Sequence, residues 1–153
     1  MTALNEHKAN LTETAILTGN MEEYTKLTGG PFTIEGTVLD GNKLGRTIGI
    51  PTINQVPAEG SLLPPFGVYF SEVVLNGYAY KGITNIGRKP TVNSKDTVTV
   101  ETYIYNFNQT IYGSYATVKL YHFRRPEMKF ADISQLKAQM KQDIEAGAAY
   151  RIQ

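Results

Sequence analysis

Two short segments of the chain carry side chains that could do chemistry together. Thr52 and Asn54 are two residues apart, so an extended backbone places both side chains on one face. A hydroxyl and an amide oxygen are hard neutral ligands that suit Mg²⁺ carried in by a nucleotide. Glu101 lies in a Thr- and Val-rich segment, on the face opposite Val100, where its carboxylate could act as a general base. A polar strand face and a solvated glutamate are the simpler interpretations of the same residues.

A glycine-rich segment, residues 41–49, precedes Thr52 in the sequence. Glycines let a backbone approach a ligand closely, and the exposed N–H groups of such a loop can surround phosphates. Lys43 and Arg46 would add positive charge there. The segment matches neither the P-loop pattern GxxxxGKS/T nor a GxGxxG turn before a helix. An ordinary turn of a β-barrel explains the same glycines.

A charged run near the end of the chain, residues 124–130, contains Arg125 and Phe130. A guanidinium and an aromatic ring in this arrangement could lie over a planar ligand. The same run could be a solvated connection that leads into the last helix. Composition does not choose between these two interpretations.

The elements that must position these residues are predicted to be mostly strands. Residues 10–28 indicate two short helices, which Asn10 with Glu13 and Asn20 with Glu23 would begin. Short Val-, Ile- and Thr-rich segments then alternate with turn signals, of which Asn76-Gly77 is the strongest hairpin signal. The predicted strands are 32–39, 67–75, 78–86, 98–107 and 115–123, together with the segment 50–54. This pattern predicts a closed or nearly closed antiparallel barrel.

The C-terminal segment predicts a helix that begins at Asp132, with Gln135 three residues later. Its apolar residues recur at spacings of three and four and form one stripe: Ile133, Leu136, Met140 and Ile144. The stripe would pack on the barrel or meet a partner.

Composition excludes several classes of function. The 153 residues suit one domain, and a net charge of +1 lacks the broad basic face that nucleic-acid binding needs. Cysteine is absent and only two histidines occur, so neither a thiolate site nor a His-rich metal site is expected. No membrane-spanning run and no signal-peptide pattern is present, which predicts a cytoplasmic protein with no membrane partner.

Taken in order, these segments resemble a known family. Gly36-Thr37-Val38, the glycine-rich segment and Ile50-Pro51-Thr52-Ile53-Asn54 are similar to the opening of riboflavin kinases, whose signature is a glycine loop followed by Pro-Thr-Ala-Asn. Further matches follow in sequence: Gly67-Val68-Tyr69, residues 85–91, Val100-Glu101, Tyr112-Gly113, Arg125-Pro126-Glu127 with Phe130, and residues 134–143. The resemblance extends from about residue 15 to about residue 149, and the ordered set is more specific than any one piece.

The resemblance implies a six-stranded antiparallel Greek-key barrel with a C-terminal helix and short N-terminal helices. It implies a monomeric riboflavin kinase that uses ATP and Mg²⁺ to convert riboflavin to FMN, with no nucleic-acid partner. Thr52 and Asn54 would hold the metal, and Glu101 would be the catalytic base. The nucleotide would contact Gly41, Lys43, Gly45, Arg46 and Thr52, and the flavin would contact Glu101, Arg125 and Phe130.

Residues 15–32 are similar to the connector between the two domains of bacterial bifunctional riboflavin kinase/FAD synthetases. We therefore expect residues 1–29 to be a connector remnant and residues 30–153 the kinase barrel, which would make FMN but not FAD. Ile53 stands where the family has Ala, and Asn106 replaces a common acidic residue. The alternatives are a flavin-binding or regulatory module without catalysis, and a small barrel that binds single strands through its aromatic residues.

Overall fold

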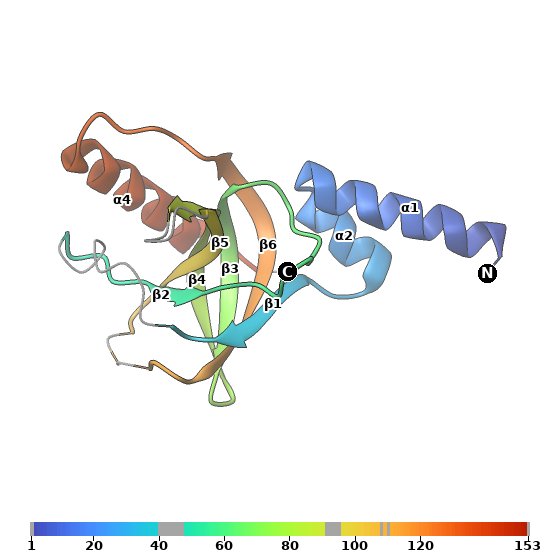
Figure 1. The fold of residues 1–153 in the computed structure, drawn as a ribbon, viewed down its shortest axis with the longest axis horizontal. Helices are drawn as coiled ribbons and strands as arrows, with labels where there is room; N and C mark the ends of the chain where they lie inside the picture. The colour runs from blue at the N-terminus through green and yellow to red at the C-terminus, as the bar shows by residue number, and fades with distance from the viewer. Residues whose placement is uncertain (1, 40–47, 91–95, 108, 110, 153) are drawn as a thin grey trace.

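The computed structural model describes residues 2–39, 48–90, 96–107, 109 and 111–152. Over these ranges the protein is mainly β: six antiparallel strands form a curled half-barrel, with two helices before it and one after it (Figure 1). The predicted fold class is confirmed. The predicted glycine-rich loop falls largely on residues 40–47, which lie outside the described ranges.

Two N-terminal helices, α1 (Ala3–Thr18) and α2 (Met21–Thr28), confirm the predicted helical pair. The predicted start at Asn10 is wrong, because no Gly or Pro interrupts residues 3–10 and the helix begins at the N-cap Thr2. Gly19 ends α1 with a φ of 76°, a left-handed conformation that glycine adopts without strain. Asn20 caps α2 as predicted, since its Oδ1 accepts from the Glu23 N–H at 3.1 Å.

The strands are β1 (Phe32–Thr37), β2 (Ile53–Gln55), β3 (Gly67–Leu75), β4 (Tyr78–Pro90), β5 (Asp96–Ile104) and β6 (Tyr115–Pro126). Their order in the sheet is β1-β6-β3-β4-β5-β2. Asn76 and Gly77 join β3 to β4 with positive φ angles of 51° and 82°, as the hairpin signal predicted. Between the ends of the described sheet, a bridge pairs Leu39 with Asn54.

The inside of the half-barrel is a closed apolar core with a small polar centre. Its main cluster includes Tyr69, Val73, Ile86 and Val100, and the helix residue Ile16 packs into the same cluster. Three buried hydroxyls form a chain through the core, and the buried Gln55 amide donates to backbone carbonyls of β1 and β6. The three hydroxyls belong to Ser71, Thr84 and Thr102. These bonds satisfy polar groups that burial would otherwise penalise.

The outer face of the sheet is covered by α4 (Ile133–Ala149), on the side of the barrel away from α1 and α2 (Figure 1). Asp132 caps this helix as predicted, with Oδ1 accepting from the Gln135 N–H at 2.9 Å. At its other end, Lys81 Nζ donates to the carbonyls of Ala148 at 3.0 Å and Tyr150 at 2.6 Å. The positive charge of Lys81 also suits the negative end of the helix dipole.

The predicted apolar stripe of this helix faces the sheet over most of its length. Leu136, Met140 and Ile144 are half-buried, whereas Ile133 at the start of the helix is 54% exposed. Gly147 lies so close to Ile83 and Tyr105 that a Cβ there would contact both side chains. The C-terminal end of α4 is therefore fixed tightly against β4 and the end of β5. None of the helices described combines the length and the apolar character that crossing a membrane requires.

Candidate active site

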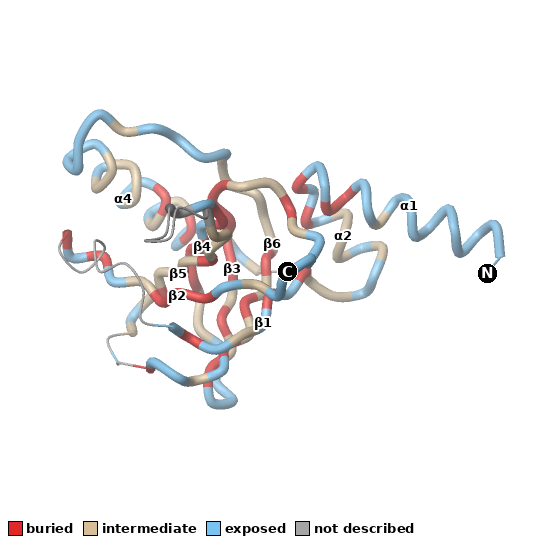
Figure 2. The backbone as a smooth tube through the Cα atoms, viewed as in Figure 1, coloured by how far each residue is buried: buried red, intermediate tan, exposed pale blue. Residues whose placement is uncertain are grey.

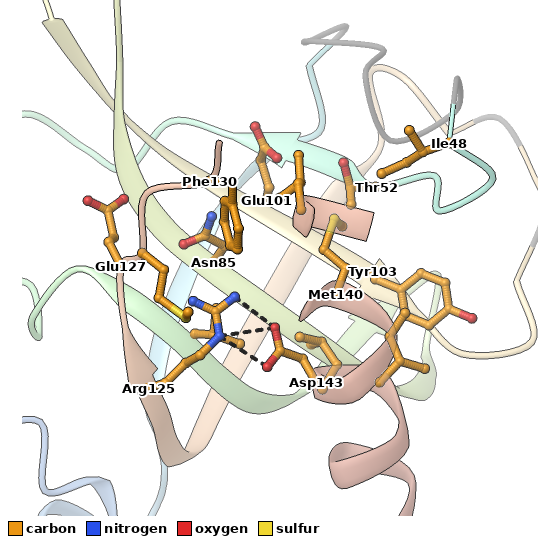
Figure 3. Close-up of a pocket in the computed structure, with 15 residues that line it drawn as sticks. Ile48, Thr52, Asn85, Glu101, Tyr103, Arg125, Glu127, Phe130, Met140 and Asp143 are labelled. Carbon is orange, nitrogen blue, oxygen red and sulfur yellow. Dashed lines mark hydrogen bonds and ion pairs between the residues drawn. The ribbon is translucent and has the colours of Figure 1, made fainter. Parts of the chain in front are cut away.

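A cavity of about 260 Å³ lies between the outer face of the sheet and α4 (Figure 3). Its walls are mainly apolar, with a few polar groups among them. The lining residues from the strands are Val68, Ile83, Asn85, Glu101 and Tyr103, and those from α4 are Leu136, Met140, Asp143 and Ile144. The connecting segments contribute Ile48, Thr52, Glu127, Met128 and Phe130, and Arg125 comes from the end of β6. Such a cavity suits a flat apolar ligand with a few polar groups.

The strand register aligns the predicted site residues in one row across the sheet. Arg125 pairs with Val68, Val68 with Asn85, Asn85 with Glu101, and Glu101 with Asn54. Directly paired residues of antiparallel strands project to the same face. Arg125 and Glu101 are three strand spacings apart in this row, or roughly 14 Å along a flat sheet. The pocket is therefore long, with different chemistry at its two ends.

One end of the pocket gathers oxygen atoms. Thr52 and Glu101 both line the cavity, and Asn54 is the direct strand partner of Glu101. Asn54 is buried and is not among the lining residues, although the pairing places it on the same face as Glu101. A hydroxyl, an amide oxygen and one carboxylate fit a hard divalent cation that takes its other ligands from phosphate and water. No group of three or more His, Cys, Asp or Glu that could hold a metal occurs among the described residues.

The other end of the pocket is built around an ion pair. The Asp143 carboxylate, 2% exposed, accepts bonds from Arg125 Nε at 3.1 and 3.2 Å and from Arg125 Nη2 at 2.8 Å (Figure 3). Gln139 Nε2 also donates to it at 3.1 Å, and Arg124 Nε lies 3.5 Å from it. This two-pronged geometry fixes the guanidinium beside the cavity. Phe130 also lines the cavity (Figure 3).

Tyr105, which follows β5, links α4 to the sheet. Its hydroxyl donates to the Ile144 carbonyl of α4. Burial, with smaller contributions from the nearby Tyr103 and Asp143, raises the pKa of Tyr105 to about 12. The hydroxyl therefore keeps its proton, and its bond to the helix, across the neutral range.

Thr52, Glu101, Arg125 and Phe130, predicted from the sequence, all line one cavity, and Asn54 is paired beside it. The predicted phosphate contacts Gly41, Lys43, Gly45 and Arg46 lie outside the described residues. Sequence reasoning missed Asp143 and Asn85 as site residues. Both residues lie in segments that match the family, Asn85 in residues 85–91 and Asp143 at the end of residues 134–143, and this match was the available signal.

The fold and the pocket define a class before any comparison: a small β-barrel domain with a mainly apolar pocket that carries an arginine–carboxylate pair at one end and oxygen atoms at the other. The chain belongs to the riboflavin kinase family, because the family model described as "Flavokinase: Riboflavin kinase" matches residues 28–151.

Curated relatives agree with this family. The chain is 40% identical over 136 residues to the bifunctional riboflavin kinase/FMN adenylyltransferase of Listeria monocytogenes, covering 89% of this chain and 43% of the relative. The Bacillus subtilis protein of the same description is 37% identical over 139 residues, covering 90% of this chain and 44% of the relative. The chain thus spans less than half the length of these relatives.

Solved structures support the fold. A crystal structure described as a macrolide-efflux protein from Streptococcus pneumoniae has a TM-score of 0.83 at 35% identity, covering 92% of this chain and 46% of that one. The riboflavin kinase of Trypanosoma brucei has a TM-score of 0.55 at 22% identity, covering 78% of each chain. The second likeness concerns the fold alone.

Proposed function

We propose that this chain transfers the γ-phosphoryl group of ATP to the 5′-hydroxyl of riboflavin, giving FMN and ADP. The observation that carries the proposal is the strand row that sets Glu101 beside Asn54 at one end of a pocket whose other end holds Arg125. Membership of the riboflavin kinase family supports the assignment of Glu101 as the base at the point where the ribityl chain would meet the nucleotide.

In this mechanism Glu101 accepts the proton of the 5′-hydroxyl while the oxygen attacks the γ-phosphorus. Thr52 and Asn54 would hold Mg²⁺ together with the nucleotide, and the ion would supply positive charge for the phosphate oxygens. Positioning and charge neutralisation supply most of the catalysis of phosphoryl transfer, so one carboxylate and two neutral ligands suffice from the protein.

The apolar length of the pocket would take the isoalloxazine ring. Phe130 offers an aromatic face, Met140 and Leu136 offer apolar contacts from α4, and Arg125 meets the polar edge of the ring. Burial of a flat uncharged ring against such walls is favourable because apolar area leaves water. The inactive flavin-binding alternative has no observation in its favour, since Thr52, Asn54 and Glu101 occur together.

The nucleotide phosphates would be contacted by Gly41, Lys43, Gly45 and Arg46. The described residues on either side of this segment support its place at the site: Leu39 is bridged to Asn54, and Ile48 lines the pocket. We also propose that residues 1–29 serve as the connector of the family, that the enzyme works as a monomer, and that it acts in the cytoplasm.

The test is conversion of riboflavin to FMN by the purified chain with ATP and Mg²⁺, followed by chromatography with fluorescence detection. Glu101→Gln removes the base without changing its size, so kcat should fall by about 10²- to 10⁴-fold. Riboflavin binding, measured by quenching of flavin fluorescence, should persist. Glu35→Gln is the matched control, because Glu35 is an exposed strand glutamate of β1 outside the pocket. A wild-type chain that forms no FMN would contradict the proposal, and a fully active Glu101→Gln would contradict the role of the base.

A further inference from the structure

Asp143 is an unusual residue for its position on α4. A buried carboxylate is costly unless it is fully paired, and this one is 2% exposed. Its partners converge from two elements: Arg125 and Arg124 from β6, and Gln139 from one turn earlier on α4. No part of the proposed phosphoryl transfer uses Asp143 directly.

The pairing determines which atoms of Arg125 remain available to a ligand. An arginine has five N–H groups. Nε and one N–H of Nη2 bond to Asp143, and one N–H of Nη1 bonds to the Pro126 carbonyl at 3.1 Å. Within the described part of the chain, two of the five N–H groups therefore remain for a ligand. Arg125 lines the cavity, in the row that leads along the sheet to Glu101.

The described residues that form or contact the ion pair, together with Glu127, carry equal numbers of positive and negative charges. Arg124 and Arg125 carry two positive charges, while Asp143 and the pocket residue Glu127 carry two negative charges. Arg125 consequently offers directed N–H donors, while the neighbouring carboxylates offset its positive charge. That combination suits a neutral carbonyl on a ring better than an anionic group.

We propose that Asp143 is a positioning residue that holds Arg125 against the pocket wall and offsets its charge, so that the pocket recognises the neutral carbonyl edge of a flavin ring. This inference rests on the proposed function, since it names how the same site selects its substrate. An arginine at the end of a strand has many rotamers, and fixing one of them in advance lowers the entropy lost on binding.

The first experiment compares kinetics of the full chain with those of Asp143→Asn. The amide keeps the shape but turns one acceptor into a donor facing Arg125, so the KM for riboflavin should rise by about tenfold. The kcat and the KM for ATP should stay near the wild-type values, because the oxygen end of the pocket is unchanged. Glu145→Gln is the control, since it removes an exposed carboxylate from the same helix and should change nothing. A wild-type riboflavin KM in Asp143→Asn overturns the proposal. A fall in kcat together with an equal rise in the KM values for riboflavin and for ATP also overturns it.

The second experiment asks whether Asp143 acts through Arg125. In an Arg125→Met background, Asp143→Asn should raise the riboflavin KM by less than about twofold, because the group it positions is gone. A full tenfold effect in that background overturns the proposal. If Asp143→Asn does not fold, Gln139→Met removes one bond to the same carboxylate and should raise the riboflavin KM by about two- to threefold. An unchanged riboflavin KM in Gln139→Met would also overturn the proposal.

Binding without ATP separates this inference from the proposed kinase activity. Suppose that the wild-type chain forms no FMN but quenches riboflavin fluorescence, and that this quenching weakens in Asp143→Asn. That result would support the positioning role and reject the kinase activity. If the chain forms FMN but Asp143→Asn binds riboflavin as tightly as the wild type, the activity is supported and the positioning role is rejected.

Discussion

At the scale of single residues, Asn85 is the clearest candidate for a substrate-binding residue beside Glu101. It is the strand partner of both Val68 and Glu101 and lines the pocket with an exposed side chain. Directly paired residues have Cβ atoms about 4.5–5.5 Å apart, so the Asn85 amide can reach the same substrate hydroxyl groups as the Glu101 carboxylate. We expect Asn85 to bind the ribityl chain.

Asn85→Ala should therefore lower kcat/KM for riboflavin by about tenfold, the value of one hydrogen bond of about 1.4 kcal/mol. The melting temperature should not change, because an exposed asparagine contributes little to the folded state. Asn10→Ala is a suitable control, since Asn10 lies on the exposed part of α1. Steady-state kinetics and thermal melts of both variants check this, and an Asn85→Ala enzyme with wild-type kcat/KM would remove Asn85 from the site.

The sequence allows a large part of this site to be predicted, and the reason lies in strand alternation. The period of two along a strand places Thr52 and Asn54 on one face of their segment, and Glu101 opposite Val100 on another, and both patterns are readable from the chain alone. The role of Asp143 is different, because it depends on a contact between α4 and Arg125 at the end of β6. A contact between two residues 18 positions apart cannot be read from the spacing within either segment.

At the scale of elements, Tyr105 links α4 to the sheet through its bond to the Ile144 carbonyl. Its pKa is raised to about 12, first by burial and then by Tyr103 and Asp143. In the unfolded chain the same group ionises near pH 10. The folded state therefore holds the Tyr105 proton more tightly than the unfolded state does. The contribution of the protonated hydroxyl to the free energy of unfolding is fully present below pH 10 and is lost as the pH rises toward 12.

Tyr105→Phe should lower the free energy of unfolding by about 1 kcal/mol at pH 8, because the bond to α4 is lost. The difference between wild type and variant should shrink as the pH rises from 10 to about 12, because only the wild type loses this contribution. Urea unfolding of both proteins at pH 8, 10 and 11 would measure it. Tyr78→Phe, at a 69% exposed position, should follow the wild type throughout. A constant difference between wild type and Tyr105→Phe would contradict this account.

The elements differ in how well the sequence predicts their limits. The β3–β4 hairpin follows from Asn76-Gly77, whose conformational preferences are local. The ends of the long strands do not, because β4 continues to Pro90 only where β5 pairs with it, and β5 ends at Ile104 before Asn106 turns with a φ of 55°. Pairing over a long separation decides these ends, and single residues do not encode it.

At the scale of the whole molecule, the N-terminal helices divide into two parts. Ile16 and Met21 are buried in the same cluster as the barrel residue Tyr69, so the second half of the helical pair packs as part of the barrel. The first half of α1 extends away from the body and is exposed along its length (Figures 1 and 2). Leu4, for example, is 76% exposed.

Removing residues 2–11 should consequently leave the melting temperature and the formation of FMN close to wild type. Ile16→Ala should instead lower the free energy of unfolding by about 2–4 kcal/mol, because it opens a cavity in the barrel core. A domain of this size loses about 2–4 °C in melting temperature for each kcal/mol, so calorimetry separates the two outcomes clearly. Leu17→Ala, at a 53% exposed position next to Ile16, controls for the substitution itself. If the truncation destabilised the protein as much as Ile16→Ala, the first half of α1 would have to pack on the barrel in solution.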